Sequence, residues 1–103
     1  MRKTHAQVQV AFALLDDPDG RHWGYDTSRR TGVRAGVLYP ILARMLANGW
    51  LTDGWEDPAT ITDKRPPRRY YRLTDAGRAE LGALLAEARK DARFAALLRV
   101  RPC

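Results

Sequence analysis

The sequence is poor in the residues that build cross-linked, metal-dependent or membrane-spanning structures. Its 103 residues include a single cysteine, Cys103, so neither an intramolecular disulfide nor a cluster of cysteine metal ligands can form. No apolar run approaches the ~20 residues that a membrane-spanning helix needs. The first residues, MRKTH, are not followed by an apolar segment, so no secretory signal is evident. We therefore expect an intracellular, cytoplasmic protein that has no membrane partner.

Patterns that carry catalysis or bind metal ions are missing as well. The two histidines, His5 and His22, lie far apart, with no carboxylate or cysteine at ligand spacing. The aspartates Asp16, Asp17 and Asp19 look like the start of a calcium loop, but the pattern does not continue, which favours a turn. There is no glycine-rich phosphate loop and no nucleophile elbow. We expect no enzyme activity, no metal site and no cofactor.

Positive charge is abundant and clustered. The chain has 18 Lys and Arg against 12 Asp and Glu, a formal net charge of +6 at pH 7, which is typical of nucleic-acid-binding domains. Between Asp63 and Leu73 only Asp63 opposes a group of basic residues, namely Lys64, Arg65, Arg68, Arg69 and Arg72. The stretch from Asp53 to Asp57 is acidic instead. This clustering favours a phosphate-binding segment more than the net charge alone does.

Three helices are predicted in the first half of the chain. Thr4 and Gln7 form a capping-box pattern ahead of an apolar face with helical spacing, made by Val8, Phe12 and Leu15. Breaking residues at 16–20 end this helix, and a second short helix is expected over 23–30, ended by Gly32. The third helix is expected over 34–48, with Pro40 in its early turns. Its apolar face comprises Leu38, Ile41, Leu42, Met45 and Leu46.

A β-hairpin and a last helix are predicted after Gly49. Residues 50–56 and 68–73 have the composition of two antiparallel strands, joined by a long loop over 57–67. Thr74 and Asp75 then begin a helix, with an apolar stripe of Leu81, Leu84, Leu85, Ala88, Ala92 and Ala95. We expect this helix to run about 24 residues, or roughly 36 Å at ~1.5 Å per residue. A small core cannot cover that length, so a second copy is the expected partner.

The predicted fold class is mostly α with a small β-hairpin (α+β), a winged helix-turn-helix. We assign residues 1–74 to the DNA-binding domain and 75–103 to a C-terminal dimerisation helix. In this layout a helix enters the DNA major groove and a charged hairpin beside it contacts phosphates. Of the tryptophans Trp23, Trp50 and Trp55, the last lies in a polar strand and is expected to be partly exposed.

Four segments, in order, resemble the PadR family of bacterial transcriptional regulators: WGYD at 23–26, GVLYPIL at 36–42, LANGWL at 46–51 and RPPRRYYRLTDAG at 65–77. The resemblance implies a winged helix-turn-helix homodimer that usually represses transcription and often releases DNA when a small molecule binds. Because the chain ends at Cys103, it also implies the short type with a single long C-terminal helix. Val37 stands where the family commonly has a small hydroxyl residue. Val33 and Arg34 stand at a position where the family commonly has a Ser or Thr cap.

Candidate site residues follow from this layout. The N-terminal part of the third helix should enter the major groove, with the Tyr39 hydroxyl on a phosphate, and the basic tip should contact phosphates or the minor groove. The expected DNA contacts are Arg34, Gly36, Val37, Tyr39, Arg44, Lys64, Arg65, Arg68 and Arg69. The expected dimer contacts are Val8, Phe12, Leu15, Leu81, Leu84, Leu85, Ala88 and Leu98. Phe94, off the leucine stripe, is expected to face an effector.

The leading hypothesis is a sequence-specific transcriptional regulator, a repressor that binds double-stranded DNA as a homodimer on a palindromic operator. A small-molecule effector would release it. The alternative is a winged-helix module that binds proteins and not DNA. The acidic stretch 53–57 favours this alternative, and the basic segment at 64–72 opposes it. The tip residues Lys64 and Arg65 are expected to be the least constrained of the basic residues.

Overall fold

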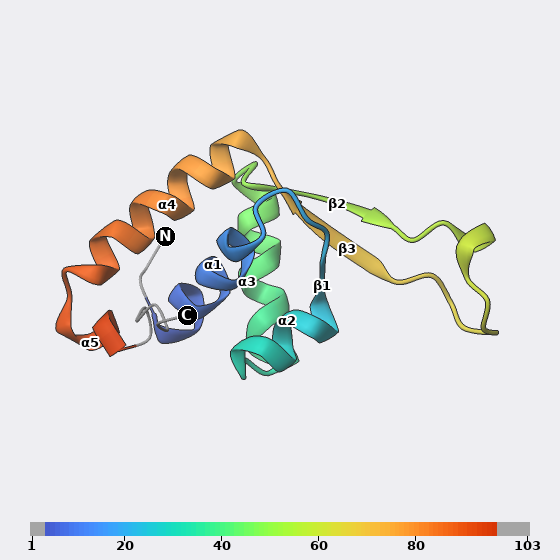
Figure 1. Ribbon diagram of the computed structural model, residues 1–103, viewed down its shortest axis with the longest axis horizontal. Helices are drawn as coiled ribbons and strands as arrows, with labels where there is room; N and C mark the ends of the chain where they lie inside the picture. Colours follow the sequence, from blue (N-terminus) through green and yellow to red (C-terminus); the bar gives the residue numbers. More distant parts are fainter. Residues whose placement is uncertain (1–3, 97–103) are drawn as a thin grey trace.

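The computed structural model describes residues 4–96, with a helical body from which a hairpin projects (Figure 1). Its elements, in chain order, are α1 (His5–Asp16), β1 (His22–Trp23), α2 (Gly24–Thr31), α3 (Ala35–Ala47), β2 (Leu51–Trp55), the 3₁₀ turn η1 (Pro58–Thr60), β3 (Arg69–Leu73), α4 (Asp75–Arg89) and α5 (Ala92–Ala95). Within residues 4–96, no helix is both long and apolar enough to cross a membrane.

The first three helices begin and end where the sequence predicts. The Thr4 hydroxyl accepts the Gln7 backbone N–H at 3.2 Å and caps α1. Gly32 ends α2 in the left-handed conformation, with φ of 74°, where a side chain would be strained. The helix α3 starts after Arg34, and Pro40 lies in its second turn. Local signals therefore account for these helix ends.

The sheet has three antiparallel strands in the order β1-β3-β2. The hairpin of β2 and β3 is confirmed, and it pairs Leu51 with Leu73 near the body and Trp55 with Arg69 farther out. The strand β1 was not predicted, since two residues are too few to show an alternating pattern. It forms because His22 lies opposite Tyr71 and Trp23 opposite Tyr70.

One hydrophobic core joins the helices to the inner end of the hairpin. Val8 and Leu14 of α1, Leu38 and Met45 of α3, and Leu81 of α4 have no exposed surface. The core therefore draws on residues both before and after Thr74. The helix α4 packs along α1 of the same chain, as Figure 1 shows.

The last helix is shorter than expected. The helix α4 has 15 residues, and after Lys90 the chain turns into α5, where the Asp91 carboxylate accepts the Arg93 N–H. The turn brings Phe94 back onto the body, where its ring is 1% exposed and meets the His5 ring edge-on at 5.1 Å. Burying a large aromatic side chain favours this turn over a straight helix, which would carry the ring beyond the core. The prediction of one helix of about 24 residues is wrong.

The expected dimer contacts are also placed differently. Val8, Leu81, Leu85 and Ala88 are buried inside the chain itself, because α4 covers its own α1. The expectation that this stripe lacks an intramolecular partner is wrong. Three of the expected contacts remain only partly buried: Phe12, Leu15 and Leu84. Leu98 lies outside the described residues.

Two glycines of α4 should respond oppositely to the same substitution. A Cβ at Gly77 would overlap the Trp50 backbone carbonyl, whereas a Cβ at Gly82 would meet no atom within 4 Å. We expect Gly77→Ala to lower the free energy of unfolding by about 2 kcal/mol through overpacking. Gly82→Ala should raise it by up to about 1 kcal/mol, because alanine favours the helix. Urea unfolding followed by circular dichroism measures both, and a stabilised Gly77→Ala variant would contradict this close packing.

Candidate nucleic-acid interface

One side of α3 is exposed while the other lies in the core. Leu38, Ile41 and Met45 point inward, whereas Val37 is 49% exposed and Tyr39 is 46% exposed. Exposure also applies to the other expected contacts on this helix, namely Arg34, Gly36 and Arg44. The sequence therefore predicted the accessible side of α3 correctly. Whether these residues contact DNA stays a prediction.

Gly36 has no packing role inside the subunit. A Cβ added there would meet nothing within 4 Å, although the residue lies in the first turn of α3. Glycine is unfavourable in a helix by about 1 kcal/mol relative to alanine. No close packing against the described residues requires glycine at position 36, so nothing within them compensates for this loss of helix stability. An outside surface that approaches the backbone closely would account for it.

The hairpin carries an ordered series of side chains along one face. From the body outward, this face has the cross-strand pairs Leu51–Leu73, Asp53–Tyr71 and Trp55–Arg69. Burial falls along the series, from Leu51 at the core to Trp55, which is 66% exposed. The partial exposure predicted for Trp55 is confirmed. Its position on the face that continues into the core was not recognised, because the strand register was unknown.

The hairpin of β2 and β3, with the loop between them, is called the wing. Two of its arginines are already paired with carboxylates. Arg69 Nε donates to Asp53 Oδ2 at 2.7 Å, and the Arg65 guanidinium donates to both oxygens of Glu56, at 2.7 and 3.0 Å. The hydrogen bonds from Arg65 lower the pKa of Glu56 to about 2. The expectation that Arg65 is among the least constrained of the basic residues is therefore wrong. A bidentate contact across the hairpin holds Arg65, and the two partners are nine positions apart in sequence.

The acidic stretch 53–57 is used within the hairpin. Asp53 and Glu56 bind the two arginines, and the Asp57 carboxylate accepts the Ala59 N–H at 2.9 Å to cap η1.

Among the expected DNA contacts, four side chains make no ion pair with residues 4–96: Arg34, Arg44, Lys64 and Arg68. The basic residues of the predicted site that form no ion pair with residues 4–96 thus lie on α3 and on the hairpin.

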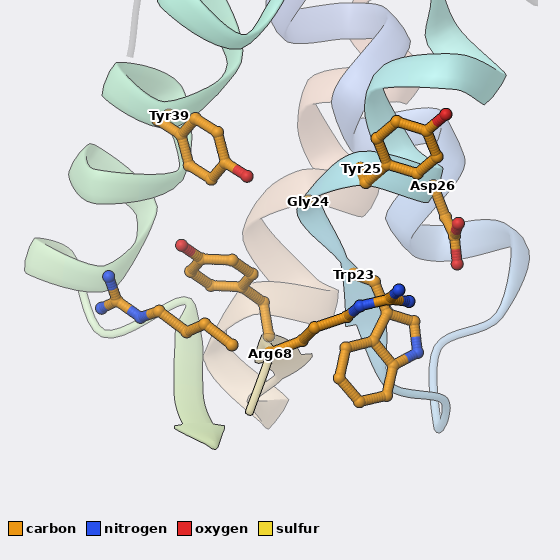
Figure 2. Close-up of a pocket in the computed structure, with 8 residues that line it drawn as sticks. Trp23, Gly24, Tyr25, Asp26, Tyr39 and Arg68 are labelled. Atoms are coloured by element: carbon orange, nitrogen blue, oxygen red, sulfur yellow. The ribbon is translucent and has the colours of Figure 1, made fainter. Parts of the chain in front are cut away.

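A pocket of about 410 Å³ lies between α2, α3 and the start of β3. It is lined by residues 23–26, by Tyr39 of α3, and by Arg68, Arg69 and Tyr71. Figure 2 shows the Tyr39 hydroxyl pointing across the opening toward Gly24, with the Arg68 side chain extending toward Trp23. The sequence placed Tyr39, Arg68 and Arg69 in one site, and the structure brings these three residues together.

The pocket also contains residues that were not predicted to belong to the site. The segment 23–26 was noted only as a matching motif, and Tyr71 was assigned no role. Strand alternation puts Tyr71 on the same face as Arg69, but the position of α2 opposite this face depends on the tertiary fold. Among the described residues, no group of three or more His, Cys, Asp or Glu side chains could hold a metal ion.

The position of Phe94 bears on the predicted effector contact. Phe94 is a residue of α5, and its ring belongs to the core cluster. Beside it, the His5 ring Nε2 donates to the Arg93 carbonyl at 3.1 Å. The prediction assumed that Phe94 lies off the apolar stripe of one long C-terminal helix. That assumption is wrong, because α4 ends at Arg89 and Phe94 lies in α5. Contact between Phe94 and an effector stays a prediction.

Comparison with known proteins gives a consistent result. A family model described as "Transcriptional regulator PadR-like family" matches residues 26–83. No protein with curated annotation matches the chain. A probable transcriptional regulator from Pseudomonas aeruginosa superposes with a TM-score of 0.68 and 28% identity, covering 96% of this chain and 68% of that chain.

Two further solved structures are similar. A PadR family transcription regulator from hypervirulent Clostridium difficile R20291 has a TM-score of 0.68 and 18% identity, over 93% of this chain and 100% of that one. The PcaV transcriptional regulator from Streptomyces coelicolor, in complex with its natural ligand, has a TM-score of 0.62 and 27% identity, over 95% of this chain and 64% of that one.

Proposed function

Because the chain belongs to the PadR-like family of transcriptional regulators, which are DNA-binding proteins and not enzymes, we propose that it is a repressor that binds double-stranded DNA as a homodimer at a palindromic operator. The predicted fold class, a mostly helical winged helix-turn-helix with a small β-hairpin, is confirmed apart from the long last helix, and the short strand β1 extends the hairpin to a three-stranded sheet. In this proposal α3 enters the major groove and the wing formed by β2 and β3 contacts the flanking backbone.

One observation carries the proposal. The basic residues among the expected contacts that form no ion pair lie on the exposed part of α3 and on the wing. The neighbouring carboxylates, Glu56 and Asp53, are bound to Arg65 and Arg69. Cations without internal partners are available for phosphates, and each phosphate contact releases counterions from DNA. Gly36 and the exposed Trp55 support close approach of a large ligand to the same two elements.

The alternative of a protein-binding module loses its main support. It depended on the acidic stretch 53–57 as a free surface, but Asp53, Glu56 and Asp57 all have partners within the hairpin.

The proposal also includes a small-molecule effector that releases the DNA and a cytoplasmic location for the protein. The support for an effector is that the similar PcaV regulator was solved with its natural ligand.

Salt dependence tests DNA binding and the role of each wing cation. Affinity for a random-sequence duplex should fall linearly as the logarithm of salt concentration rises. Lys64→Ala and Arg68→Ala should each flatten that slope by about one unit. Arg65→Ala should flatten it much less, because Glu56 already offsets the charge of Arg65. Fluorescence anisotropy at a series of salt concentrations measures all three.

The matched control is Arg89→Ala, at the exposed end of α4, which should leave the slope unchanged. The double variant of Lys64 and Arg65 should lose about one unit, rather than the two expected if both cations were free. A wild-type protein whose binding to DNA does not depend on salt would contradict the proposed function.

A further inference from the structure

Trp55 is a large apolar side chain that lies in solvent. Its indole is 66% exposed, and it takes part in no aromatic or cation–π contact within residues 4–96. Tryptophan is highly buried on average, because a large apolar ring gains free energy when it leaves water. An indole left in solvent at the outer end of a strand is therefore typical of a contact with another molecule.

The strands around Trp55 hold it on an ordered part of the wing. It lies directly across from Arg69 in the strand register. The Arg69 guanidinium donates to Asp53, and its Cζ lies 5.3 Å from the centre of the Tyr71 ring. Tyr71 in turn belongs to the buried core. Because the backbone at Trp55 is fixed in this way, little conformational entropy is lost when the indole binds a partner.

Trp55 also lies on the face of the wing that is turned toward α3. Strand alternation places it on the same face as Tyr71 and Arg69, and these two residues line the pocket together with Tyr39 of α3. Two positions separate Trp55 from Asp53, the partner of Tyr71, which corresponds to about 7 Å along the strand. Since the hairpin projects from the helical body (Figure 1), Trp55 lies beyond the pocket on the side of the exposed face of α3.

The charges of the wing favour a polyanion as the partner of Trp55. Lys64 and Arg68 make no ion pair with residues 4–96, whereas Asp53 and Glu56 are bound to arginines. DNA is such a polyanion, and in the proposed complex α3 occupies its major groove. A side chain that lies farther along the wing, beyond the intervening phosphate backbone, then meets the adjacent minor groove.

We propose that Trp55 enters this minor groove and inserts its indole as an apolar wedge at a TA step. Wedges of this kind partly unstack the bases and kink the duplex by about 20–90°. Pyrimidine–purine steps unstack most easily. A·T pairs also lack the guanine N2 amino group, which would obstruct the indole, and they offer acceptors for its N–H. The inference rests on the proposed function, and it adds a residue and a base step that this function does not require.

The first test removes the indole. Trp55→Ala should weaken binding to a duplex selected from a random pool about tenfold, a typical effect of losing one base-pair contact. The salt slope should stay unchanged, since the indole carries no charge. Trp55→Phe keeps an apolar ring and should retain part of the affinity. The matched control is Thr52→Ala, at an exposed position on the opposite face of β2, which should bind like the wild type.

The second test locates the base step. Replacing the TA step by CG in both half-sites of the selected duplex should weaken wild-type binding about tenfold. Trp55→Ala should bind the two duplexes equally. Inosine in place of guanine removes the N2 amino group from the minor groove and should restore much of the wild-type affinity. Equal binding of the TA and CG duplexes by the wild type would overturn the proposal.

The third test measures the deformation of the DNA. The base analogue 2-aminopurine at the step becomes more fluorescent when it unstacks, so the wild type should raise this signal and Trp55→Ala should not. Energy transfer between dyes at the duplex ends should show a bend of at least about 20° for each wing with the wild type, and a smaller bend with Trp55→Ala. A straight duplex in the wild-type complex would contradict the wedge.

The outcomes separate the role of Trp55 from the proposed function. If Lys64→Ala and Arg68→Ala flatten the salt slope but Trp55→Ala binds and bends DNA like the wild type, the protein binds DNA and the wedge is wrong. If the wild type does not bind DNA, both proposals fail. If Trp55→Ala sediments as a monomer while the wild type is a dimer, Trp55 belongs to a contact between copies and the wedge is wrong.

Discussion

The variant Leu84→Asp is expected to sediment as a monomer and to lose operator binding. Leu84 of α4 is only partly buried, as are Phe12 and Leu15 of α1, and these two helices pack together. A second copy that covers these side chains would gain about 1.5–3 kcal/mol for each leucine it buries fully. A carboxylate at position 84 would be buried without a partner in that interface, which strongly opposes association.

Loss of DNA binding follows from the geometry of a palindromic site. The proposed dimer would hold two copies of α3 about 34 Å apart, one turn of DNA, so that both half-sites are bound together. A monomer keeps only the contacts of one half-site. Analytical ultracentrifugation gives the mass, and anisotropy with a selected operator gives the affinity.

Controls keep this prediction specific. Thr60→Asp introduces the same charge on the exposed turn η1 and should leave the protein dimeric. Leu15→Glu, on the neighbouring helix, should also give monomers. Circular dichroism must show native helix content in each variant, because Leu84 also packs against the core. A folded Leu84→Asp protein that remains a dimer would place the interface elsewhere.

Replacing Phe94 by alanine should be the most destabilising single change proposed for this chain. Removal of a buried Phe side chain typically lowers the free energy of unfolding by about 3–5 kcal/mol, since it leaves a cavity. Its ring, in α5, is buried and also contacts the His5 ring. A small domain is stable by only about 5–15 kcal/mol in total. The loss therefore amounts to a large part of the stability.

Urea unfolding measured by circular dichroism checks this value. Phe94→Leu, which keeps much of the buried volume, should cost clearly less, and Tyr25→Ala, at an exposed position, should change little. A change below about 1 kcal/mol for Phe94→Ala would show that the ring is not part of the core. In that case α4 would continue beyond Lys90, as the sequence pattern suggested.

The sequence by itself determined the elements that depend on neighbouring residues. Thr4, Gly32 and Thr74 set helix ends through hydrogen bonds or a left-handed backbone that involve only the adjacent turn. The helical spacing of apolar residues in α3 separated its core side from its exposed side. The composition of residues 50–73 predicted the two strands of the hairpin. It also located the acidic stretch at 53–57 and the basic residues at 64–72.

Only the tertiary structure decided the features that depend on residues far apart in the chain. The strand β1 exists because it pairs with β3, and Arg65 is held because the hairpin register brings Glu56 to it. The end of α4 depends on Phe94, which gains burial against α1 by leaving the helix. Neither propensity nor periodicity contains this information, since in each case the free energy comes from contacts that form only when the chain is folded.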